Sequence, residues 1–233
     1  MISVIIPCYN ESKTIEIIID KIIAIKEFDI EIIIIDDFSS DGTIEVLKTK
    51  IAQKVNKILF NEKNFGKGYC IRKGFEESKG DIILIQDADL EYNPNDYSKL
   101  LKPILNGDAD VVYGSRFLGG EEKRVLFFWH SLANKILTTI SNMCSDINLT
   151  DMETCYKVFK SEIIKKIRLE ENRFGFEPEI TAKIAKLKPR IYEVGISYHG
   201  RTYDEGKKIG LKDAFSALRC IIKYNFFNDR KNY

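Results

Sequence analysis

The sequence predicts an α/β fold: a mostly parallel central sheet flanked by helices, in a single domain. Short apolar, β-branched runs alternate with segments whose apolar residues recur at helical spacing, which is the pattern of βαβ units. Polar clusters accompany these runs. Because ligands of such sheets bind beyond the carboxyl ends of the strands, we expect the clusters to share one rim and to form the functional site.

The elements of the first half can be assigned in order. The expected strands are residues 3–7, 31–35, 57–61 and 82–86. Helices are expected from residue 15, from N-cap candidates at 39–42 through about residue 50, and over residues 69–77.

The second half has a different pattern. Strands are expected at residues 110–114 and 191–198, and a long apolar, aromatic segment spans residues 126–147. A terminal amphipathic helix would place apolar residues on one face and polar or basic residues on the other: Leu211, Phe215, Leu218 and Ile222 against Lys212, Ser216, Arg219 and Lys223.

The composition is that of an ordinary globular protein, with 233 residues, 44% hydrophobic and 30% charged. Its net charge of +1 predicts no nucleic-acid partner. Five scattered cysteines without a CxxC pair are typical of thiols in a reducing compartment. We expect no signal peptide and no membrane span, hence a cytoplasmic protein; peripheral contact with the cytoplasmic membrane face and a homo-oligomer stay open.

The apolar run at residues 82–85 leads into the most informative cluster, Asp87-Ala88-Asp89. Two carboxylates spaced i and i+2 on a strand project to the same side, where they repel each other unless a cation lies between them. Mg²⁺ or Mn²⁺ carrying a phosphate-bearing substrate is the natural occupant. The alternative is that one aspartate caps a helix and the other is solvated.

The other clusters have similar alternatives. Asp36 and Asp37 can cap a helix, Gly66 and Gly68 can admit a phosphate or make a plain turn, and Tyr9 can stack on a base or simply pack. Basic candidates that would stabilise a departing phosphate are Arg116, Arg201 and Lys207. The convergence of these clusters on one rim is a stronger argument than any one of them.

Eight motifs follow one another along the chain: VIIPCYNE, IIDDFSSDGT, NFGKG, DADLEYNP, YGSRF, LTDMETCYKVF, RFGFEPEI and YHGRTYDEGKKIG. This ordered set resembles family 2 glycosyltransferases of the GT-A fold, close to the dolichyl-phosphate mannose/glucose synthases. The resemblance covers residues from about 3 to 222. Where that group reads roughly DLTSGFR, this chain has DMETCYK, and it has Glu91 where a glutamine is usual. These departures weaken a mannose assignment.

The resemblance implies a role for each candidate residue. Nucleotide-sugar binding falls to Pro7, Tyr9, Glu11, Asp37, Lys67, Asp87, Arg201 and Lys207. Metal binding falls to Asp89 and Glu91, and catalysis to Asp87, Asp89, Arg116, Asp151 and Glu153. Residues 1–115 would bind the donor, residues 116–205 the acceptor, and residues 206–233 would form the terminal helix. Glycines at 200, 206 and 210 predict a loop that orders over the donor diphosphate.

The implied reaction is inverting transfer of a sugar from a nucleotide sugar, with UDP favoured and GDP open, to a polyprenyl phosphate. Such an acceptor is already anionic and needs no base, and the apolar segment at 126–147 favours it. The same segment can instead pack against the sheet or a second copy. A hydroxyl acceptor is the alternative, with Asp151 or Glu153 as base. Non-transferase alternatives are a sugar nucleotidyltransferase or a sugar-nucleotide-binding protein.

Overall fold

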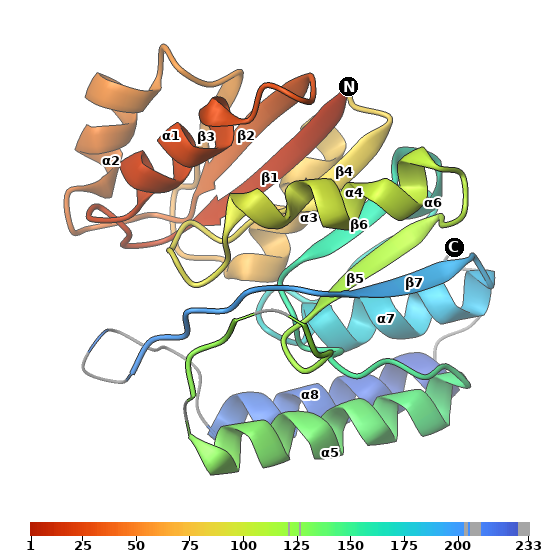
Figure 1. The fold of residues 1–233 in the computed structure, drawn as a ribbon. Helices are drawn as coiled ribbons and strands as arrows, with labels where there is room; N and C mark the ends of the chain where they lie inside the picture. The colour runs from red at the N-terminus through yellow and green to blue at the C-terminus, as the bar shows by residue number, and fades with distance from the viewer. Residues whose placement is uncertain (121, 126, 203–204, 206–210, 228–233) are drawn as a thin grey trace.

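The computed structural model describes residues 1–120, 122–125, 127–202, 205 and 211–227. Within these residues a seven-stranded sheet has the order β3-β2-β1-β4-β6-β5-β7 (Figure 1). The strands are β1 (Ile2–Cys8), β2 (Ile30–Asp36), β3 (Lys57–Phe60), β4 (Ile82–Ile85), β5 (Val111–Ser115), β6 (Lys157–Lys160) and β7 (Ile191–Gly195). Only β6 runs antiparallel to its neighbours, β4 and β5, among the described strands. The predicted α/β class with a mostly parallel sheet is confirmed.

Helices cover both faces of the sheet (Figure 1). They are α1 (Ile15–Ala24), α2 (Thr43–Val46), α3 (Lys67–Glu77), α4 (Tyr97–Leu105), α5 (Phe128–Ser145), α6 (Ser161–Ile164), α7 (Phe176–Leu187) and α8 (Leu211–Phe226), with short turns η1 (Leu47–Ile51) and η2 (Pro94–Asp96). Helix α3 packs against β1 and β2, and α4 packs against β5. Strands enclosed on both faces are continuous apolar runs, and Val4, Ile5 and Ile85 are accordingly fully buried.

Most strand ends differ from the expectation by one residue or more, and the differences at β4 and β7 shape the rim. Strand β4 ends at Ile85, so Asp87 and Asp89 lie in the loop beyond it, and the alternation of strand side chains does not set their directions. Strand β7 ends at Gly195 instead of residue 198. Beyond it, both the backbone N–H and the hydroxyl of Ser197 donate to Asp96, which directs the chain toward the loop after β4.

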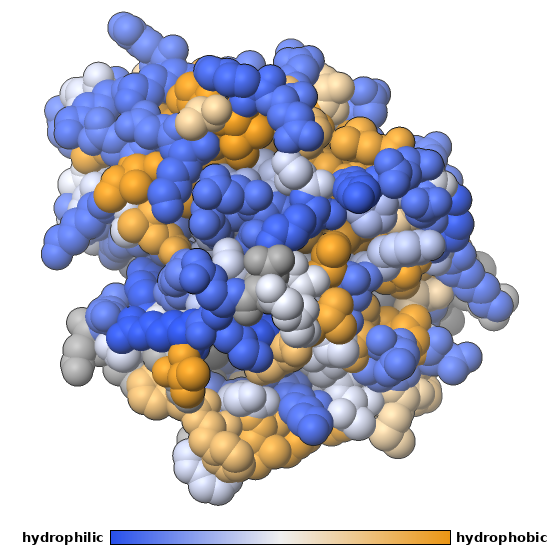
Figure 2. Space-filling model, in the orientation of Figure 1, coloured by the Kyte–Doolittle hydropathy of each residue, from blue (hydrophilic) through white to orange (hydrophobic). Residues whose placement is uncertain are grey.

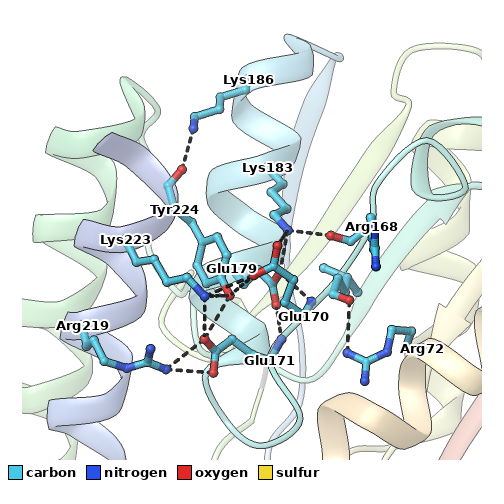
Figure 3. Close-up of polar contacts among 11 residues, drawn as sticks. Arg72, Arg168, Glu170, Glu171, Glu179, Lys183, Lys186, Arg219, Lys223 and Tyr224 are labelled. Atoms are coloured by element: carbon cyan, nitrogen blue, oxygen red, sulfur yellow. Dashed lines mark hydrogen bonds and ion pairs between the residues drawn. The ribbon is translucent and has the colours of Figure 1, made fainter. Parts of the chain in front are cut away.

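A network of charged side chains joins α7 to α8 (Figure 3). Lys183 is fully buried and pairs with Glu179 at 2.7 Å. Glu179 also accepts the backbone N–H groups of Glu170 and Glu171. On the other side, the Tyr224 hydroxyl donates to Glu171 at 2.9 Å. The segment before α7 is therefore held between two helices.

Helices α5 and α8 lie side by side beyond α7 (Figure 1). The buried face of α8 is Ala217, Cys220, Ile221 and Tyr224. Much of the apolar surface of the pair is exposed, at Phe128 (68%), Trp129 (73%), Met143 (79%), Phe215 (74%) and Ile222 (43%). Figure 2 shows the apolar side chains gathered over α5. We call these five residues the apolar face.

Candidate active site

Three carboxylates from the loops after β1 and β4 surround one guanidinium. The Arg201 Nη2 atom lies 2.5 Å from Asp89 Oδ2, its Nε lies 3.1 Å from Glu91 Oε1, and its Nη1 lies 3.2 Å from Glu11 Oε1. The Arg201 backbone N–H also donates to Glu91 Oε1 at 2.9 Å. We call Glu11, Asp89 and Glu91 the acidic triad. Three sequence-predicted residues are thus brought together around a fourth.

The triad carries more negative charge than one arginine balances. Burial and the charges of Asp87 and Glu91 raise the pKa of Asp89 to about 8, against the opposing effect of Arg201. Carboxylate oxygens are the ligands that Mg²⁺ and Mn²⁺ prefer, so the donor set fits such a cation chemically. In the part of the chain that the structure describes, however, no three acidic, histidine or cysteine side chains are arranged to hold a metal. The Arg201 guanidinium lies between the triad carboxylates instead.

Asp87 points to a different partner. Its Oδ1 atom lies 2.9 Å from Lys67 Nζ, at the start of α3, and that ammonium also lies 3.4 Å from Glu177 Oε1, at the start of α7. Burial acts to raise the pKa of Asp87, but the charge of Lys67 and its hydrogen bond hold that pKa below its usual value. The two aspartates of the DAD motif are therefore separately paired, one with a lysine and one with an arginine.

Arg116 is held by Asp151 through two parallel contacts. Its Nε and Nη2 atoms each lie 2.7 Å from an oxygen of the Asp151 carboxylate. That carboxylate is fully buried and also accepts the Arg116 backbone N–H and the Asn134 side-chain amide. Both Asp151 oxygens are occupied by this pairing, which fixes the direction of the arginine.

Glu153 has different surroundings from Asp151. Burial, followed by the charge of Glu177, raises the pKa of Glu153 to about 8, although Lys157 and Arg116 oppose the shift. Its Oε1 atom is enclosed and has no hydrogen-bond partner among the described residues.

Asp37 was expected to contact a nucleoside, and in the structure its carboxylate binds groups of the protein itself. Its carboxylate accepts the side chain of Asn61 at 2.9 Å and the backbone N–H groups of Phe65 and Gly66 at 2.9 and 2.7 Å. Asp37 therefore holds the loop before α3. Its contact with a nucleoside stays a prediction, as do those of Pro7, which is half-buried in β1, and Tyr9, which is 39% exposed at the rim.

The glycines of the NFGKG motif serve close packing. Gly66 has a φ of +104°, and a side chain there would collide with the backbone of Asn172. A side chain at Gly68 would likewise collide with the backbone of Glu171. The loop that carries Lys67 is thus packed against the segment before α7, which a larger residue would prevent.

Some predicted features lie outside the described residues. They are Lys207 and two of the three loop glycines, Gly206 and Gly210. The expected closing loop is therefore described only at Gly200, Arg201, Thr202 and Glu205.

The site contains residues whose roles the sequence analysis missed. Glu177 lies within the quoted motif RFGFEPEI, but nothing local shows that its side chain meets Lys67. Asn134 lies in the apolar segment and donates to Asp151. No local signal distinguishes Asn134 from the other polar residues of this helix, such as Thr138 and Asn142.

Comparison with known proteins identifies the family. The sequence model described as glycosyl transferase family 2 matches residues 3–168. The chain belongs to glycosyl transferase family 2. Among the solved structures with this fold is glucosyl-3-phosphoglycerate synthase from Mycobacterium tuberculosis with Mn²⁺, UDP and phosphoglyceric acid, with a TM-score of 0.75 and 18% identity over 99% of this chain and 80% of that one. The same enzyme with Mg²⁺ and UDP gives a TM-score of 0.74 at 19% identity, over 99% and 81% of the two chains. The predicted GT-A fold is confirmed.

The curated family 2 relatives are longer than this chain. Dolichol-phosphate mannosyltransferase from Pyrococcus furiosus is 28% identical over 95% of this chain and 63% of its own length. Undecaprenyl-phosphate 4-deoxy-4-formamido-L-arabinose transferase from Aeromonas hydrophila is 26% identical, over 89% and 62%. Dodecaprenyl-phosphate galacturonate synthase from Rhizobium johnstonii is 21% identical, over 97% and 67%. Of the helices the structure describes, none combines the length and apolar character needed to cross a membrane.

Proposed function

We propose that this chain is a metal-dependent, inverting glycosyltransferase that moves a sugar from a nucleotide sugar to a polyprenyl phosphate. The observation that carries the proposal is the placement of the acidic triad and the Arg116–Asp151 pair at one rim of the sheet. Tyr198 links them, because its hydroxyl donates to Glu91 at 2.9 Å and the Arg116 guanidinium lies 5.2 Å from its ring. Relatives named for polyprenyl-phosphate acceptors support the choice of acceptor.

Each charged group has a proposed task. Asp89 and Glu91, with Glu11 beside them, would hold Mg²⁺ or Mn²⁺, which supplies positive charge to the departing diphosphate. Arg201, released from the triad, and Lys207 would bind that diphosphate. Pro7, Tyr9 and Asp37 would bound the nucleoside, for which UDP is favoured over GDP. Residues 1–115 would thus serve the donor, and residues 116–205 would serve the acceptor apart from Arg201, which would reach across to the donor diphosphate.

Arg116 would bind the acceptor phosphate. The Nε and Nη2 atoms of Arg116 are both bound by Asp151, so the guanidinium is held in one orientation. Its remaining Nη1 group is then the part that would contact the phosphate. The bound phosphate oxygen attacks the anomeric carbon of the sugar, and the nucleoside diphosphate leaves from the opposite side. Because the nucleophile is already an anion, no residue has to remove a proton.

A hydroxyl acceptor is the second candidate, and one observation favours it. Glu153 has an enclosed oxygen without a partner in the described part of the chain and a pKa raised to about 8, which suits a general base near neutral pH. Asp151 is engaged by Arg116 and Asn134, so in this alternative we assign the base to Glu153.

Nucleotide release tests the proposal. UDP-sugars and GDP-sugars are incubated with Mn²⁺ and either polyprenyl phosphate or soluble sugar acceptors, and freed UDP or GDP is measured. We expect release that depends on polyprenyl phosphate and stops with excess EDTA or with Asp89→Ala. Asp81→Ala is the control, since that exposed carboxylate lies before the amino end of β4. Transfer only to soluble acceptors supports the second candidate, and full activity of Asp89→Ala contradicts the metal assignment.

A further inference from the structure

The chain segments that carry the two proposed phosphate-binding arginines are joined to each other by backbone hydrogen bonds. The stretch that follows Arg116 lies beside Tyr198, which is three residues before Arg201. The Arg124 N–H donates to the Tyr198 carbonyl at 2.9 Å, and the Tyr198 N–H donates to the Glu122 carbonyl at 3.2 Å. The acceptor side of the rim is thus connected to the segment that carries Arg201.

The side chain of Arg124 adds contacts to the same segment. Its Nη1 atom donates to the Gly200 carbonyl at 3.1 Å and lies 2.8 Å from Glu205 Oε2. The same oxygen of Glu205 accepts the backbone N–H of Thr202 at 2.7 Å. The Arg124 side chain therefore holds the residues on both sides of Arg201, one directly and one through a carboxylate.

These contacts belong to the arrangement in which Arg201 lies among the carboxylates of the acidic triad. Gly200 directly precedes Arg201, so movement of the arginine away from the triad displaces the carbonyl that Arg124 binds. The apparent affinity of a cation for the triad is reduced by the fraction of molecules in which Arg201 still occupies it. A contact that favours the occupied arrangement therefore weakens cation binding.

We propose that Arg124 is a positioning residue: it keeps Arg201 on the acidic triad and thereby limits, from the acceptor side of the rim, the binding of a divalent cation. The inference rests on the proposed function and adds a residue that acts on the metal site through Arg201. The Arg124 side chain is 44% exposed, and a hydrogen bond and ion pair at such a position correspond to about a fivefold change in an equilibrium.

A double-mutant cycle tests this pathway. Mn²⁺ is titrated into the nucleotide-free wild type, Arg124→Gln, Arg201→Gln and the double variant, and free Mn²⁺ is followed by electron paramagnetic resonance. We expect Arg124→Gln to bind Mn²⁺ about fivefold more tightly than the wild type. In the Arg201→Gln background the same substitution should have no effect, because the residue through which it acts is gone. A simple effect of the lost charge would appear in both backgrounds.

Lys123→Gln is the matched control. It removes the same charge from the adjacent residue, whose ammonium donates to the Arg116 carbonyl at 3.2 Å, and it should leave the Mn²⁺ affinity unchanged. Arg124→Gln keeps the backbone N–H that donates to Tyr198 and changes an exposed side chain, so we expect the variant to fold. An unchanged urea midpoint would show that the change in Mn²⁺ affinity does not come from lost stability.

The outcomes separate the inference from the proposed function. An Mn²⁺ affinity of Arg124→Gln that is unchanged, weaker, or matched by Lys123→Gln overturns the inference and leaves transfer to polyprenyl phosphate standing. Equal tightening in both backgrounds also overturns it. Absence of Mn²⁺ binding by all of these proteins, with transfer that persists in excess EDTA, contradicts the proposed metal site, and the inference falls with it. Tightening confined to the background that retains Arg201 supports the inference.

Discussion

At the residue scale, the central feature is that Arg201 lies among the three carboxylates proposed to hold a divalent cation. The guanidinium contacts all three triad carboxylates, and each additional positive charge at the same point is repelled by it. Arg201 is therefore expected to leave when metal and donor arrive together, and the diphosphate offers it a new anionic partner. The same residue would stabilise the free protein and then bind the donor.

We predict that Arg201→Gln binds Mn²⁺ about tenfold more tightly than the wild type when no nucleotide is present, because the competing charge is gone. The measurement is a Mn²⁺ titration followed by electron paramagnetic resonance. The same variant should bind UDP or GDP more weakly. Arg190→Gln, which removes an arginine from a surface ion pair with Asp110, should change neither affinity. Equal or weaker Mn²⁺ binding by Arg201→Gln contradicts the competition.

Glu153 leads to a prediction about pH. Its pKa of about 8 in the folded protein exceeds the ordinary value of 4.5 because of burial and Glu177, while Lys157 and Arg116 oppose the shift and nearby Asp151 adds to it. The folded state then holds the proton more tightly than the unfolded state, so wild-type stability falls as pH rises from about 4.5 to about 8.

Glu153→Gln has no proton to lose at this position. The stability of the variant relative to the wild type should therefore increase through this pH window and level off above it, as measured by urea midpoints from pH 4 to 9. Exposed Glu45→Gln serves as the comparison and should show no such trend. A difference between Glu153→Gln and wild type that is constant with pH argues against the raised pKa.

At the scale of elements, the segment at residues 168–172 connects the donor loop to two helices. It packs against Gly66 and Gly68 on one side. On the other side it is held by Glu179 of α7 and Tyr224 of α8 (Figure 3). The position of Lys67 therefore depends on how α7 and α8 are packed.

The buried pair Lys183–Glu179 is the sensitive point of this connection. Lys183→Met leaves the Glu179 charge without its cation and should cost about 3–5 kcal/mol of unfolding free energy. Chemical denaturation measures this directly, and exposed Lys102→Met should cost little. Adding Glu179→Gln to Lys183→Met should recover part of the loss. A double variant no more stable than Lys183→Met indicates that the charge is not what destabilises it.

At the scale of the whole molecule, the apolar face lies on α5 and α8, beyond α7 (Figure 1). Helix α5 is connected to Arg116, because its Asn134 donates to Asp151, which in turn holds the arginine. Exposed aromatic side chains on amphipathic helices are typical of surfaces that enter the headgroup layer of a membrane. Arg219 pairs with Glu171 and Lys223 pairs with Glu170, so both cations already have partners within the protein. The proposed membrane contact therefore rests on the apolar side chains.

We predict that the protein sediments with liposomes that contain anionic lipid and that Phe128→Ser/Trp129→Ser abolishes most of this binding. Each aromatic removed takes roughly 2 kcal/mol of apolar burial with it. Phe60→Ser/Leu105→Ser removes two exposed apolar residues elsewhere and should leave binding intact. Absence of sedimentation, together with a dimer in solution that the aromatic substitutions dissociate, would show that a second copy covers the face.

The sequence predicted some elements and missed others for identifiable reasons. Strands β1, β2 and β4 were found because continuous isoleucine-rich runs are typical of strands buried on both faces. Strand β6 was missed because it has only four residues, begins and ends with lysine, and shows no alternation of apolar and polar residues. Helix α7 was missed because its buried charges resemble an exposed surface until Glu179 and Lys183 are seen to pair.

By itself the sequence determined the fold class and which polar residues lie at the rim, because both follow from short-range pattern and from the rule that ligands bind at the carboxyl ends of strands. Only the tertiary structure decided how the charges pair. Arg201 meets Asp89 across 112 positions of the chain, and Arg116 meets Asp151 across 35. Such partners are chosen by the way strands and loops converge in space, where burial makes each unpaired charge costly, and no local pattern records that choice.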